Sequence, residues 1–181
     1  MIIVLGKTCS GKDTIVNQLI SKHGYQKCIT YTTRPMRDNE EDGIAYHFIS
    51  TEKFKRRIEE GFFIEYKIYN TESGSWYYGT ALQDFKKADN KTIVILTPQG
   101  YRDITNKLKV KPKSIYIYAN NSTIKSRLLK RGDEISEAKR RVENDNKDFF
   151  GVENEVDKII YNNDYCSIDE VVEKFLCFVE G

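Results

Sequence analysis

The sequence predicts an α/β fold in which a parallel β-sheet carries helices on both faces. Short, continuous apolar runs at residues 2–5 and 92–97 are typical of strands that are buried on both sides. Segments with helical periodicity alternate with these runs along the chain, which is the order expected of βαβ units. An aromatic segment between residues 31 and 80 interrupts this order, and we interpret it as an inserted β lobe of the same domain.

The first half of the chain yields its elements in order. The strand at 2–5 is followed by a glycine loop and by a helix from Thr14 to residue 22, whose apolar residues recur at helical spacing. A strand is expected at 26–33 and a short charged helix at 51–61, ended by a glycine. Alternating aromatic residues at 62–69 and 76–78, separated by the polar segment 70–75, predict a β-hairpin.

The second half returns to alternating strands and helices. Helices are expected at 83–87 and 102–108, with buried strands at 92–97, 114–118 and 158–161. Residues 122–149 form a long charged helical region broken at Gly132, and the last helix begins at Ser167, where Ser167 and Glu170 form a capping box. We therefore expect one domain, 1–181, with a core (1–30, 81–121 and 143–181), an inserted lobe (31–80) and a helical lid (122–142).

Composition excludes several classes of protein. Twenty-nine Lys and Arg against 27 Asp and Glu leave a net charge of +2 over 181 residues, which argues against a dedicated nucleic-acid binder. No apolar run approaches the roughly 20 residues that span a bilayer, and the apolar start is too short for a signal sequence. Four cysteines are scattered without metal-ligand spacing. A cytoplasmic protein that does not bind membranes is expected.

The glycine loop after the first strand fits the phosphate-binding pattern G-x-x-x-x-G-K. Backbone N–H groups of such a loop surround phosphates, the following helix adds its dipole, and the lysine reaches the β and γ oxygens. Its position between a buried strand and a helix favours this interpretation over a structural turn with an exposed lysine. The ATP-binding residues expected here are Gly6, Lys7, Thr8, Cys9, Ser10, Gly11, Lys12, Asp13 and Thr14.

Asp13 departs from the usual pattern, in which a Ser or Thr after the lysine places its hydroxyl on Mg²⁺. Its carboxylate could hold Mg²⁺ directly or through water, because a hard cation accepts carboxylate oxygen. Alternatively, Asp13 only begins the helix, where the dipole favours a negative charge. Both interpretations remain open from the sequence.

A second group of residues has the chemistry of an acceptor pocket. Arg34 and Arg37 flank a proline and can present two guanidinium groups to one phosphate, and Tyr46 adds a phenolic donor. The alternative is a solvated loop with surface ion pairs. Glu65 can accept hydrogen bonds from a base edge; the alternative is a solvent-facing strand residue, since glutamate side chains are usually exposed.

In this order, these motifs resemble the guanylate kinase family, from the phosphate loop to about Tyr165. The quoted segments are Thr30-Tyr-Thr-Thr-Arg34-Pro-Met-Arg37, Glu40, Gly43, Tyr46-His-Phe, Phe63-Ile-Glu65 and Tyr77-Tyr78-Gly79-Thr80. The resemblance implies a P-loop NTPase core, a lobe that binds the nucleoside monophosphate, a lid, and transfer of phosphate from Mg²⁺-ATP to GMP.

The resemblance also assigns roles by position. The residues that would hold the GMP phosphate are Arg34, Arg37, Tyr46 and Tyr78. Glu65 would accept hydrogen bonds from the guanine N1 and N2 hydrogens, and Thr30 and Thr80 would donate to guanine O6. The lid arginines Arg127, Arg131 and Arg141 would act with Lys12 as catalytic residues, and Asn162 would lie beside the adenine. In phosphoryl transfer such cations position the substrates and stabilise charge. The nucleotide partners would be ATP and GMP, bound by a monomer or a homodimer.

The sequence differs from the family where acidic residues are usual, because Ile95 and Thr97 stand there. Two alternatives to a GMP kinase therefore stay open. One is a related P-loop kinase with another acceptor, such as a deoxynucleoside monophosphate or a phosphorylated sugar. The other is a non-catalytic guanylate-kinase-like binding module, although such modules typically lack the loop lysine or the lid arginines that this chain retains.

Overall fold

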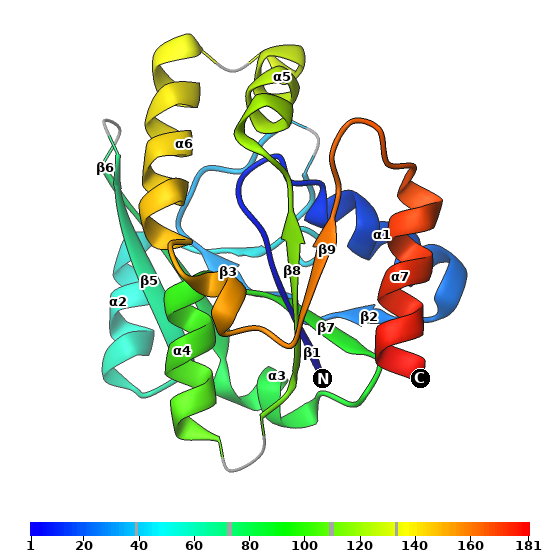
Figure 1. Cartoon of the computed structure of the whole chain (residues 1–181). Coiled ribbons are helices and arrows are strands. Elements are labelled where there is room, and N and C mark those ends of the chain that lie inside the picture. The colour runs from blue at the N-terminus through cyan, green and yellow to red at the C-terminus, as the bar shows by residue number, and fades with distance from the viewer. Residues whose placement is uncertain (39, 72–73, 109–110, 133) are drawn as a thin grey trace.

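The fold is built on a five-stranded parallel sheet in the order β2-β7-β1-β8-β9. The computed structural model describes residues 1–38, 40–71, 74–108, 111–132 and 134–181. The strands are β1 (Ile2–Leu5), β2 (Gln26–Lys27), β7 (Thr92–Ile95), β8 (Lys113–Tyr118) and β9 (Lys158–Tyr161). Figure 1 shows α1 (Lys12–His23) and α7 (Ile168–Glu180) beside one face of this sheet and α4 (Pro98–Lys107) beside the other. The expected α/β fold with helices on both faces is confirmed.

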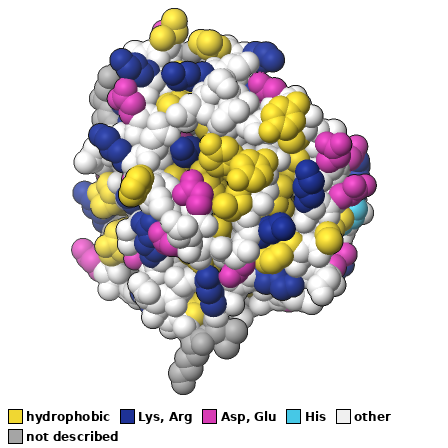
Figure 2. Space-filling model, in the orientation of Figure 1, with side chains coloured by type: hydrophobic (Ala, Val, Ile, Leu, Met, Phe, Trp, Pro, Cys, Tyr) yellow, Lys and Arg dark blue, Asp and Glu magenta, His cyan; other side chains and the backbone are white. Residues whose placement is uncertain are grey.

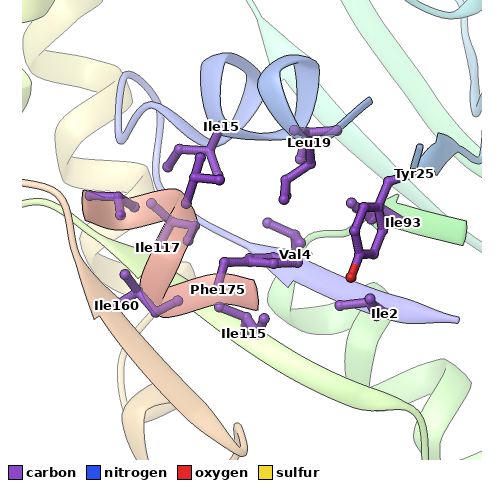
Figure 3. Packing of buried hydrophobic residues seen from close by; sticks show 13 residues of the cluster. Ile2, Val4, Ile15, Leu19, Tyr25, Ile93, Ile115, Ile117, Ile160 and Phe175 are labelled. Carbon is purple, nitrogen blue, oxygen red and sulfur yellow. The ribbon is translucent and has the colours of Figure 1, made fainter. Parts of the chain in front are cut away.

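Side chains of the central strand alternate between two hydrophobic cores. Ile2 and Val4 point into a cluster that α1 and α7 close, and Phe175 of α7 lies at its centre (Figure 3). Ile3 and Leu5 point to the opposite face, where they meet Ile104 of α4. Because consecutive strand residues face opposite sides, an apolar run without alternation is what a sheet covered twice requires.

The inserted lobe is a second, mixed sheet in the order β4-β3-β6-β5. Its elements are β3 (Tyr31–Thr32), β4 (His47–Phe48), β5 (Phe63–Thr71), β6 (Gly74–Ala81) and the helix α2 (Thr51–Glu59). Phe54 of α2 is fully buried and stacks on Phe63 with ring centroids 4.3 Å apart. A Cβ atom on Gly79 would lie 2.9 Å from Phe54, so only glycine lets β6 approach this ring. The lobe therefore has a small core of its own.

One expected strand was wrong in extent. Residues 26–33 do not form one strand, because β2 pairs with β7 in the parallel sheet and β3 pairs with β4 and β6 in the lobe. The expected hairpin is confirmed as β5 and β6, and residues 72 and 73 of its turn lie outside the described residues.

The expected lid, residues 122–142, falls within α5 (Asn121–Arg131) and the first part of α6 (Ile135–Asp148), which stand together above the sheet in Figure 1. The expected break at Gly132 is confirmed, because Gly132 ends α5 in a left-handed conformation with φ of +83°. The remaining helices are α3 (Leu82–Lys87) and the short η1 (Val152–Asn154), and α7 begins at the expected Ser167–Glu170 capping box.

The surface is mixed in charge. Figure 2 shows Lys and Arg side chains spread among Asp and Glu over one face, with hydrophobic side chains gathered near its middle, where β8 and β9 lie in Figure 1. Within the described ranges, no helix has the length and apolar character needed to cross a membrane.

Replacing Phe175 with alanine should lower the free energy of unfolding by about 3–5 kcal/mol, because it leaves a cavity between α7 and the sheet. Phe150→Ala is the matched control, since this ring is 85% exposed and its loss should change stability by less than about 0.5 kcal/mol. Urea unfolding followed by circular dichroism measures both. Equal losses in the two variants would contradict the assigned core.

Candidate nucleotide-binding site

The phosphate loop lies between the end of β1 and the start of α1. Gly11 caps the helix in a left-handed conformation with φ of +88°, which favours glycine. Asn162, which follows β9, donates from Nδ2 to the carbonyl oxygen of Ser10 at 2.8 Å, and a Cβ atom on Gly11 would collide with that amide. Ser10, within the loop, and Asn162 are both buried. Their observed role is therefore to hold the loop in shape.

Cys9 is the one described non-glycine residue with a positive φ, at +53°. A left-handed conformation costs a residue with a Cβ atom roughly 1–2 kcal/mol, so the loop stores strain at this position. Cys9 also lines the large cavity beside the loop. Strain at a ligand-facing loop is common where the backbone must present its N–H groups in a fixed arrangement.

A cavity of about 1140 Å³ opens between the phosphate loop, the inserted lobe and the lid. The loop and α1 contribute Thr8, Cys9, Lys12, Asp13 and Thr14 to its wall. The lobe contributes Arg34, Arg37, Tyr46 and Tyr78, and the lid contributes Arg131 and Arg141. Three segments that are far apart in the sequence therefore meet around one space. The expected site residues that lie outside this wall are Gly6, Lys7, Ser10, Gly11, Thr30, Glu65, Thr80, Arg127 and Asn162.

Arg34 and Arg37 are held in place by one carboxylate. Arg34 is only 6% exposed and donates from Nη1 and Nη2 to the two oxygens of Glu40 at 2.9 and 2.8 Å. The backbone N–H of Arg37 donates to the same carboxylate at 2.9 Å. Burial raises the pKa of Glu40, but these hydrogen bonds outweigh that effect, so the pKa is lowered and the carboxyl group stays charged.

The phenol groups of Tyr46 and Tyr78 stand beside these arginines. Their ring centroids are 5.9 Å apart, and the guanidinium carbon of Arg34 lies 5.5 Å from the Tyr46 ring. Burial, and then the negative charge of Asp13, raise the pKa of Tyr46. The hydroxyl of Tyr46 therefore remains protonated at neutral pH and can donate a hydrogen bond into the cavity.

Glu65 is buried in the lobe, so the solvent-facing interpretation of this residue is wrong. It is 7% exposed and accepts a hydrogen bond from the hydroxyl of Thr80 at 2.5 Å across the β5–β6 pair. Burial raises the pKa of Glu65 to about 7. A Cβ atom on Gly100 would lie 2.6 Å from its carboxylate, so α4 closes the far side. The backbone carbonyl oxygen of Thr30 accepts a hydrogen bond from the backbone N–H of His47 in the same lobe.

The lid arginines take two different positions. Arg127 packs against the outside of the phosphate loop, donating to the carbonyl oxygens of Cys9 at 3.3 Å and Asn162 at 3.1 Å. Arg131 and Arg141 line the cavity. The pKa of Arg37 is lowered first by burial and second by the charge of Arg34, and the charges of Arg131 and Arg141 add to this effect. Arg131 and Arg141 therefore line the same cavity as Arg34 and Arg37.

Two charged residues, Asp145 and Lys27, take up positions at the loop and the cavity that the sequence does not predict. Asp145 of α6 accepts a hydrogen bond from the backbone N–H of Thr8 at 2.6 Å, and burial raises its pKa. Lys27 of β2 lines the cavity. Lys7 donates to Asn146, next to Asp145, at 2.7 Å. The sequence does not indicate either position, because Lys27 lies within an expected strand and Asp145 within an expected helical region. Only the tertiary structure brings them to the site.

Asp13 has the chemistry of a single metal ligand. Its side chain is 64% exposed, lies 3.7 Å from the ammonium of Lys12 and lines the cavity together with Thr14. The described residues contain no group of three or more His, Cys, Asp and Glu side chains placed around a common point. Mg²⁺ bound with phosphates usually keeps several waters and takes only one or two protein oxygens, so this sparse donor set fits it.

Thr97 stands where an acidic residue is usual in the family. Its hydroxyl caps α4 by accepting a hydrogen bond from the backbone N–H of Gly100 at 3.1 Å.

A strand, a glycine loop and a helix that form one wall of a cavity, with paired arginines on the other wall, define a P-loop nucleotide-binding protein. Comparisons with known proteins specify the family. The guanylate kinase family model matches residues 1–180. The guanylate kinase of Sulfurimonas denitrificans is 32% identical over 90% of this chain and 80% of its own length, and that of Helicobacter hepaticus is 30% identical over 95% and 86%.

The fold has a similar counterpart among solved structures. The crystal structure of guanylate kinase from Anaplasma phagocytophilum superposes with a TM-score of 0.71 at 23% identity, covering 99% of this chain and 84% of that one. This chain belongs to the guanylate kinase family.

The stability of the protein should depend on the protonation of Glu65. Its pKa is about 7 in the folded state against an ordinary 4.5, so the folded protein holds the proton more tightly than the unfolded chain. Stability should fall as the pH rises from 4.5 to 7, by up to about 3 kcal/mol. Glu65→Gln keeps an acceptor for Thr80 without this penalty.

Urea unfolding of both proteins between pH 4 and pH 8 measures the effect. The Gln variant should gain stability relative to the parent as the pH rises through this range, and the difference should level off above pH 7. A difference that stays constant with pH would contradict the raised pKa of Glu65.

Proposed function

We propose that this protein transfers the γ-phosphate of ATP to GMP, yielding ADP and GDP. The observation that carries the proposal is the shared cavity, with the phosphate loop on one wall and Arg34, Arg37, Tyr46 and Tyr78 on the other. The guanylate kinase relatives support the same assignment of donor and acceptor. Phosphates of two nucleotides can meet in this space because both walls offer hydrogen-bond donors and positive charge.

The transfer needs positioning and charge stabilisation rather than an acid or a base. A phosphate oxygen of GMP attacks the γ-phosphorus, a new P–O bond forms, and the bond to the β–γ bridging oxygen breaks, leaving its electron pair on ADP. The attacking phosphate is largely a dianion at neutral pH and has no proton to lose. Lys12, Arg131 and Arg141 would stabilise the charge on the transferring group.

Guanine would be selected by Glu65, whose charged carboxylate can accept from both N1–H and N2–H. Adenine presents an acceptor at N1, which would face an acceptor oxygen of the buried carboxylate, and this disfavours adenine strongly. Thr80 donates to Glu65 in the observed structure, so its first role would be to orient the carboxylate. Binding of guanine would favour the charged form and lower the pKa of Glu65 from about 7.

Mg²⁺ would enter with ATP, held by Asp13 and by the hydroxyl of Thr14, and would supply charge neutralisation at the phosphates. Asn162 and Arg127 would act on the donor side through the shape of the phosphate loop, which both contact. We also propose that the enzyme is cytoplasmic and acts as a monomer or a homodimer.

A panel of nucleoside monophosphates, each with Mg²⁺-ATP, tests the function through ADP release. GMP and dGMP should be turned over, and kcat/KM for GMP should exceed that for AMP by about 100-fold or more, because Glu65 rejects the wrong base edge. Lys12→Met is the control for background hydrolysis and should be inactive. Preference for a pyrimidine nucleotide or a phosphorylated sugar would overturn GMP as the acceptor, and ATP binding without turnover would identify a binding module.

A further inference from the structure

Among the cations that line the cavity, Lys27 belongs to the parallel sheet and not to the phosphate loop, the acceptor motif or the helices α5 and α6. Lys27 stands at the end of β2, on the edge of the parallel sheet, and its partly buried side chain lines the cavity. Its ammonium donates to the backbone carbonyl oxygen of Ala45 at 3.1 Å. Ala45 immediately precedes Tyr46, so this bond ties the core sheet to the loop that carries an acceptor-side phenol.

Lys27 lies between the two walls of the site. On the acceptor side, its Nζ atom is 5.5 Å from the centroid of the Tyr46 ring, which also has the Arg34 guanidinium carbon at 5.5 Å. On the donor side it interacts electrostatically with Asp13 and Lys12. Burial lowers the pKa of Lys27, whereas the charge of Asp13 opposes that shift.

We propose that Lys27 is a catalytic residue whose ammonium binds the phosphate of the acceptor nucleotide. This inference rests on the proposed function, which places that phosphate beside Arg34 and Arg37. An ammonium has three hydrogens, and the bond to Ala45 uses one, so the same group can hold the loop and donate to phosphate oxygens.

The electrostatic setting supports an anionic partner for Lys27. Its ammonium is partly removed from water in a cavity that also holds Lys12 and Arg37, and such crowding of like charges is unfavourable. Asp13 and Glu40 offset part of the repulsion. A phosphate dianion bound between the two walls would offset the remaining repulsion. In the acceptor nucleotide, this phosphate carries the oxygen that attacks the γ-phosphorus.

The alternative is that Lys27 only fixes the loop through Ala45. The two roles differ in what they do to a ligand without a phosphate. Guanosine uses the base pocket but offers no anion, so loss of a phosphate contact should leave its affinity unchanged. A displaced loop would weaken guanosine and GMP alike.

Lys27→Gln tests the proposal, because its amide can still donate to Ala45 but carries no charge. Calorimetric titration of the protein should show GMP affinity lowered about 10- to 100-fold, as expected for a lost charge-assisted hydrogen bond, with guanosine affinity within about twofold of the parent. At saturating GMP and ATP, kcat should fall about tenfold or more. Lys27→Arg should recover most of the GMP affinity.

Lys91→Gln is the matched control, since it removes the same charge from an exposed position outside the cavity and should behave as the parent protein. Urea unfolding is followed for each variant, and Lys27→Met replaces Lys27→Gln if the latter is unstable. Unchanged GMP affinity, or equal loss for guanosine and GMP, would overturn the role of Lys27. Failure of the parent protein to phosphorylate GMP would instead refute the proposed function, because the binding comparison is made without ATP.

Discussion

The ion pair between Arg34 and Glu40 is the contact on which the acceptor half of the site depends. Two guanidinium groups, those of Arg34 and Arg37, cannot stand side by side in a partly buried wall unless a carboxylate offsets their repulsion. Glu40 does so with both oxygens and also accepts the backbone N–H of Arg37. The arginines are therefore positioned before a phosphate arrives, which lowers the entropy lost on binding.

The donor half depends on the parallel sheet. The phosphate loop leaves the carboxyl end of β1, and Asn162 follows the carboxyl end of β9 and holds the loop from below. Ligands of open parallel sheets bind at this edge because the loops after several strands converge there. Asp145 reaches the N–H of Thr8 from α6, which joins the lid to the same loop. A phosphate that accepted this N–H would have to displace the carboxylate of Asp145.

Features encoded by neighbouring residues could be predicted from the sequence. The phosphate loop, the Ser167 capping box and the end of α5 at Gly132 each depend on a few consecutive residues with defined backbone requirements. The segment 26–33 was harder, because alternation indicates a strand but not which sheet the strand joins. The structure divides it between β2 and β3.

Dependence on tertiary structure also explains which features of the candidate site could not be predicted from the sequence. Lys27 and Asp145 look like ordinary surface charges in the sequence, and only the tertiary structure brings Lys27 to the cavity and Asp145 to the phosphate loop. The burial of Glu65 also depends on tertiary structure, since α4 and β6 close around it. Site residues within motifs could thus be proposed from their position in the sequence, whereas their protonation and their supporting contacts could not.

The central claim is that donor and acceptor phosphates occupy one cavity at the same time. Calorimetric binding of a single molecule in which adenosine and guanosine are joined by an oligophosphate bridge tests this most directly. One molecule should bind per chain, at least about 100-fold more tightly than either ATP or GMP, because the second contact becomes intramolecular. An affinity no better than that of ATP alone, or two molecules bound per chain, would contradict a shared cavity.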